Sequence, residues 1–80
     1  MKIELIQGQF NAKDALELIS KMIDAKIKFH ENRITNMCGE EDIKMRERKI
    51  KQLQKDLFEA RNYIGTKENI TIESEILLSN

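Results

Sequence analysis

Apolar and polar residues alternate at both ends of the chain. Residues 2–7 place Ile3 and Leu5 on one face of an extended segment and the charged residues on the other, and Gly8 then interrupts the pattern. A second alternation covers residues 70–78. The two patterns predict strands over about 2–7 and 70–78, each with one buried and one solvated face, as in an antiparallel sheet.

The segment after the first strand has helical periodicity. Asn11, with Asp14 three residues later, forms a typical N-cap with an acid in the first turn, so a helix should begin at about Ala12. Apolar residues then recur at steps of three and four, which predicts one apolar face of a helix over about 12–36. That face consists of Ala12, Leu16, Ile19, Ile23, Ile27 and Ile34, with His30 in the remaining position.

A second apolar row lies beside this face. It consists of Leu18, Met22, Ala25 and Phe29. Together the two rows are wider than one partner helix can cover, so something else must pack there. We therefore expect the second row to lie at a dimer or partner interface.

A glycine and a group of acids separate this helix from the next. Gly39 follows the helical run, and Glu40, Glu41 and Asp42 are typical of a new helix N-terminus. Apolar residues then repeat with heptad spacing up to Gly65, which predicts a helix over about 40–64. The heptad positions are Ile43, Ile50, Leu57 and Ile64, with Leu53 and Ala60 between them.

These elements predict an α+β fold in one domain, residues 1–80, that is mostly helical. The order is β-α-α-β, with a long antiparallel, coiled-coil-like helical hairpin and a small antiparallel two-stranded sheet. If the chain bends near Cys38, residues of the two helices whose numbers sum to about 77 face each other across the hairpin. That register places His30 opposite Arg46, with Glu47 alongside, as a polar layer in the apolar seam.

Size and composition favour self-association. A domain of 80 residues has a thin margin of stability, and its single cysteine excludes an internal disulfide and the usual cysteine-rich metal modules. The longest uncharged stretch is eight residues, far from the roughly 18 that cross a bilayer. The N-terminus lacks a secretory pattern, so we expect a cytoplasmic protein.

The polar layer is the first candidate for chemistry. A histidine near a carboxylate can act as an acid or base at neutral pH, but a polar layer in a helical seam more often fixes the register, which is the favoured interpretation. A metal site built from His30, Cys38, Glu40 and Glu41 lacks the ligand spacing of structural zinc sites. Cys38 lies beside a helix N-terminus, but three neighbouring acids oppose a reactive thiolate.

A basic stripe follows the second predicted helix. It consists of Lys44, Arg48, Lys51 and Lys55. The stripe could follow a phosphate backbone, yet the pairs Glu40–Lys44 and Glu47–Lys51 have the spacing of a solvated face. With 14 basic and 14 acidic residues the net charge is zero, so a solvated or partner-facing stripe is favoured.

The sequence contains no motif that names a reaction. It has no glycine-rich phosphate loop and no nucleophile elbow, no cofactor is expected, and a hairpin this small should offer little concave surface. The leading hypothesis is a non-enzymatic structural or interaction module that acts as a homodimer. A small nucleic-acid-binding regulator using the basic stripe is the alternative.

Overall fold

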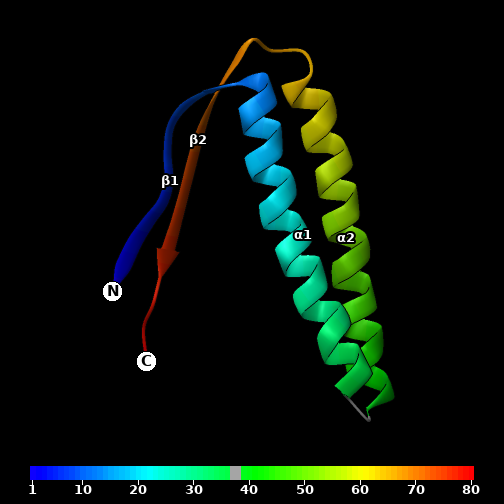
Figure 1. Ribbon diagram of the computed structural model, residues 1–80. Helices are drawn as coiled ribbons and strands as arrows, with labels where there is room; N and C mark the ends of the chain where they lie inside the picture. The colour runs from blue at the N-terminus through cyan, green and yellow to red at the C-terminus, as the bar shows by residue number, and fades with distance from the viewer. Residues whose placement is uncertain (37–38) are drawn as a thin grey trace.

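The chain folds in the order strand, helix, helix, strand, which confirms the predicted α+β architecture (Figure 1). The computed structural model describes residues 1–36 and 39–80. Its elements are β1 (Lys2–Asn11), α1 (Ala12–Asn36), α2 (Glu40–Ile64) and β2 (Asn69–Leu77). The strands pair antiparallel in a two-stranded sheet, and the helices lie side by side as a hairpin. The predicted bend at Cys38 lies outside the described residues.

Strand β1 is longer than the sequence predicted. We expected it to end before Gly8, but it runs through Gly8 to Asn11. Gly8 pairs with Ile72 and has φ of 139°, a backbone conformation that residues with a Cβ rarely adopt. The glycine therefore allows the strand to continue.

A bulge in β1 also changes which residues face the helices. The register shifts between Glu4, which pairs with Glu75, and Ile6, which pairs with Ser74. Because an extra residue reverses the alternation, Leu5 is exposed and Ile6 packs against the core. The prediction that Ile3 and Leu5 share the buried face is therefore wrong.

The predicted cap starts α1. The backbone N–H of Asp14 donates to Asn11 Oδ1 at 2.8 Å, and Asn11 Nδ2 donates to Asp14 Oδ2 at 3.2 Å. The backbone N–H of Ala12 donates to the carbonyl of Glu68 at 3.0 Å. The cap thus fixes the start of α1 beside the start of β2.

The hydrophobic core lies where the sheet meets the hairpin. Its buried apolar residues, among those described, are Ala15, Ile64 and Ile72. Toward their free ends the strands diverge from the hairpin, so the chain termini lie away from the ends of α1 and α2 at Asn36 and Glu40 (Figure 1). The radius of gyration is 15.0 Å, against about 12 Å for a compact domain of this length.

Candidate functional site

Two arginines lie beside an exposed aromatic ring in the half of the hairpin away from the sheet, and two lysines act on the histidine next to it. Phe29 is 51% exposed. The guanidinium carbons of Arg33 and Arg46 lie 5.1 and 5.7 Å from its ring centroid, within cation–π range. Lys26 and Lys49 are close enough to act electrostatically on the neighbouring His30. We call this set, Lys26, Phe29, Arg33, Arg46 and Lys49, the hairpin patch.

His30 lies buried beneath the hairpin patch. Arg46 Nη1 donates to His30 Nδ1 at 2.8 Å, which confirms the predicted pairing across the hairpin. A guanidinium can only donate, so the accepting imidazole is neutral and carries its proton on Nε2. Burial, and then the positive charges of Arg46, Lys49 and Lys26, lower the pKa of His30.

Glu47 does not complete the predicted polar layer. It is exposed, and in the part of the chain that the structure describes no hydrogen bond or ion pair joins it to His30 or Arg46. The polar contact in the seam is therefore between the His30 imidazole and the Arg46 guanidinium. Because a neighbouring cation disfavours protonation, this environment suits a fixed neutral histidine that sets the register of the helices.

Charged residues on the opposite face of α1 are paired. Lys21 Nζ lies 2.9 Å from Glu17 Oε1, and Lys28 Nζ lies 3.0 Å from Asp24 Oδ2. These contacts lower the pKa of Glu17 and raise that of Lys28. By contrast, no described carboxylate forms an ion pair with a cation of the hairpin patch. Among the described residues, the cations of the patch therefore have no ion-pair partner.

The second apolar row of α1 leads from the core into the hairpin patch. Leu18 packs against the core, Met22 is half-buried, and Ala25 and Phe29 are exposed. Since these residues share one face of the helix, that face starts under the sheet and emerges where the strands diverge. The outer half of the predicted interface row is therefore uncovered by its own chain.

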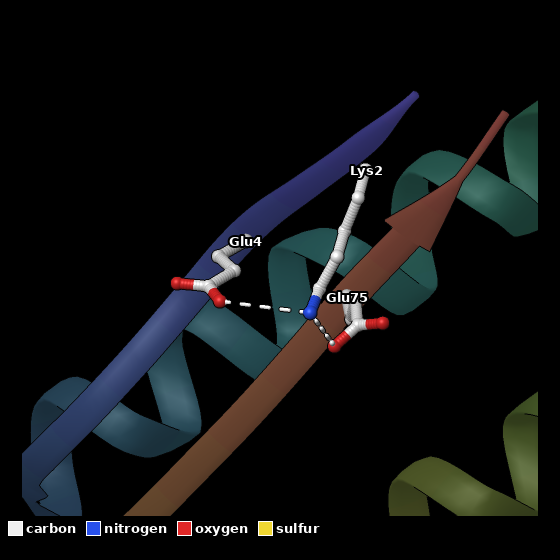
Figure 2. Close-up of polar contacts among 3 residues, drawn as sticks. All are labelled: Lys2, Glu4 and Glu75. Atoms are coloured by element: carbon white, nitrogen blue, oxygen red, sulfur yellow. Dashed lines mark ion pairs between the residues drawn. The ribbon is translucent and has the colours of Figure 1, made fainter.

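The sheet carries acidic residues on the face turned away from the core. Because successive side chains of β2 alternate and Ile72 is buried, Glu73, Glu75 and the exposed Leu77 share the outer face. Glu4 pairs directly with Glu75 across the strands. Figure 2 shows Lys2 between them, its Nζ 4.0 Å from Glu4 and 3.6 Å from Glu75. We call Glu4, Glu73, Glu75 and Leu77 the acidic sheet face.

An open groove of about 800 Å³ runs between α2 and β2. The expectation of little concave surface is therefore wrong. Its lining includes the core residues Ile64 and Ile72 and also charged side chains, namely Asp56, Glu59, Lys67 and Glu73.

The basic stripe lies on the exposed surface of α2. Its four cations are all exposed, and Lys44 Nζ lies 3.7 Å from Glu40 Oε1 as predicted. The predicted pair of Glu47 with Lys51 does not form among the described side chains. Arg48, Lys51 and Lys55 therefore point to solvent without a carboxylate partner there.

Metal ligands do not gather in the described residues. Within 1–36 and 39–80 there is no group of three or more His, Cys, Asp or Glu side chains that could hold an ion, and Cys38 lies outside those ranges. Neither described helix combines the length and apolar character needed to cross a bilayer. No protein-family model, curated protein or solved structure matches this chain.

Proposed function

We propose that this chain is a non-enzymatic interaction module that acts as a homodimer. One observation carries the proposal: the single chain exposes 6485 Å² of surface. A compact protein of 9.4 kDa exposes about 5,000 Å². The excess, about 1,500 Å², exceeds the roughly 800 Å² that each partner contributes to a stable interface.

The excess surface contains large apolar side chains at both diverging ends. Near the hairpin bend these are Phe29 and Met45, and at the strand ends they are Ile76, Leu77 and Leu78. Exposed apolar surface of this kind is typical of an interaction site. A second copy would cover it and add apolar burial to a core in which three of the described apolar residues are buried.

The sheet supports the same proposal. A two-stranded sheet alone is marginally stable in water, and each of its strands has an unpaired edge that can accept another strand. A dimer protects such edges. The single cysteine of the chain fits a reducing compartment, so we propose a cytoplasmic location.

Light scattering after gel filtration tests the homodimer. We expect a mass of two chains at micromolar concentration, and a thermal midpoint that rises with protein concentration because folding and association are coupled. A mass of one chain, with a midpoint independent of concentration, would contradict the proposal.

A nucleic-acid-binding regulator is the second candidate. It is favoured by Arg48, Lys51 and Lys55, whose charges face solvent without described acidic partners. Binding to duplex DNA or RNA should then weaken steeply with salt. Replacing Arg48, Lys51 and Lys55 with Gln should abolish it, whereas replacing Lys21 and Lys28 on α1 should have little effect. Equal binding by both variants would contradict this candidate.

A further inference from the structure

The chain carries two complementary surfaces that it cannot join within one molecule. The hairpin patch has two arginines beside the exposed ring of Phe29 and two lysines that act electrostatically on the neighbouring His30. The acidic sheet face has three carboxylates and an exposed leucine, near the strand ends. The hairpin patch combines basic side chains with an exposed ring, and the acidic sheet face combines a net negative charge, from three carboxylates with Lys2 among them, with an exposed leucine. Each surface therefore has the chemistry that the other would bind.

The fold keeps these surfaces apart. The opposite face of the sheet packs against α1 through Ile72, so the acidic sheet face is directed away from its own hairpin. The strand ends also diverge from the bend (Figure 1). Contact between the two surfaces therefore needs a second molecule.

We propose that the hairpin patch of each subunit receives the acidic sheet face of the other. This rests on the homodimer proposed above and specifies its interface. A two-fold axis makes the contact twice, since each copy offers both surfaces. The arrangement brings partner cations to Glu4 and Glu75, which oppose each other across the sheet with Lys2 as their only ion-pair partner in the described chain.

Both surfaces offer exposed apolar and charged groups for this contact. The contact would draw on the surface excess of about 1,500 Å², and it places Phe29 and Leu77, 51% and 70% exposed, within the interface. The cations available to the partner, Lys26, Arg33 and Lys49, lack described acidic partners in their own chain. Association should therefore weaken with rising salt, as for other charge-matched surfaces.

Charge reversal on each surface provides the test. The hairpin variant carries Lys26→Glu and Lys49→Glu, and the sheet variant carries Glu73→Lys and Glu75→Lys. Each variant alone brings like charges together at both contacts. We therefore expect the dissociation constant of its dimer to rise about tenfold or more. Mixed in equal amounts, they form a pair in which both contacts are again complementary, so association should return.

A matched control separates local from overall charge. The variant Lys51→Glu with Lys55→Glu changes the net charge by the same amount as the hairpin variant, but on the basic stripe of α2. Its dimer should have the same dissociation constant as the dimer of the original chain. Analytical ultracentrifugation measures each sample, and circular dichroism verifies that each is folded.

The outcomes separate this inference from the proposed function. If the original chain is monomeric, the homodimer itself is wrong. If it is dimeric and the hairpin and sheet variants dimerise equally well, or their mixture gains nothing, the homodimer stands and this docking is wrong. Restored association only in the mixture supports both.

Discussion

The two ends of the helical hairpin are held together in different ways. At the sheet end, Ala15, Ile64 and Ile72 are buried among apolar neighbours from all four elements. At the bend end, the one buried side chain among the described residues is His30, whose partner is a guanidinium. Apolar burial stabilises a fold in proportion to area, whereas a polar layer selects a register. The comparison assigns most of the apolar stabilisation to the sheet end and the selection of helix register to the bend end.

Replacing Ile72 with Ala should give the largest effect. Ile72 is 7% exposed, and such a truncation costs about 2–5 kcal/mol. That is comparable with the roughly 3–5 kcal/mol available to a domain of this size. Urea unfolding followed by circular dichroism should show a largely unfolded variant. Phe58→Ala, at a side chain 66% exposed, is the control and should stay within about 0.5 kcal/mol. Equal losses would contradict the assignment of the core.

Gly8→Ala should destabilise the sheet end by about 1 kcal/mol or more, because φ of 139° is strained for a residue with a Cβ. A Cβ at this position would meet no atom within 4 Å, so the loss would report backbone conformation and not a clash. Gln9→Ala, on the exposed face of the same strand, is the control. Chemical denaturation measures the free energy of unfolding of both variants. If Gly8→Ala leaves that free energy unchanged, the strand does not need this backbone conformation.

Asn11→Ala should cost about 1 kcal/mol, since it removes the side chain that caps α1. Asn11→Ser should retain most of the stability, because a serine hydroxyl can accept the same bond from the backbone N–H of Asp14. The free energy of unfolding measures both variants. Similar losses for Ala and Ser would indicate that Asn11 acts through the strand and not through the cap.

The elements of this fold could be predicted because their signals are periodic and local. The seam of α2 repeats every seven residues, and the Asn11 cap depends on residues three apart. The bulge at Leu5 could not be predicted, since the alternation of Ile3 and Leu5 fits a regular strand equally well. Only pairing with β2 reveals the extra residue.

The candidate site was predictable in part. His30 and Arg46 can be identified because both interrupt an apolar seam, whereas Lys26 and Lys49 are ordinary surface lysines until the hairpin brings both within electrostatic range of His30. One signal could have distinguished them: Lys21 and Lys28 each follow an acid by four residues, and these two do not. Glu47 was wrongly included because it is adjacent in sequence to Arg46, and adjacent residues on a helix point about 100° apart.

His30→Gln should give the smallest effect, visible only as a change in pH dependence. Burial and nearby cations lower the pKa of His30, so as the pH falls through about 6.5 the unfolded chain takes up a proton that the folded chain does not. The free energy of unfolding of the original chain should therefore decrease below that pH. A glutamine oxygen can still accept the bond from Arg46 but does not titrate in this range.

The two proteins should be compared at one concentration, above and below the ordinary histidine pKa. Protonation of carboxylates on acidification affects the stability of both proteins alike. The difference between their curves of unfolding free energy against pH therefore isolates the contribution of the imidazole, which is the only one in the chain. We expect the original chain to lose more stability on acidification than the glutamine variant. Parallel curves, or a greater loss in the variant, would mean that the bend end does not hold a neutral histidine, and the contrast between the two ends would then reduce to apolar burial alone.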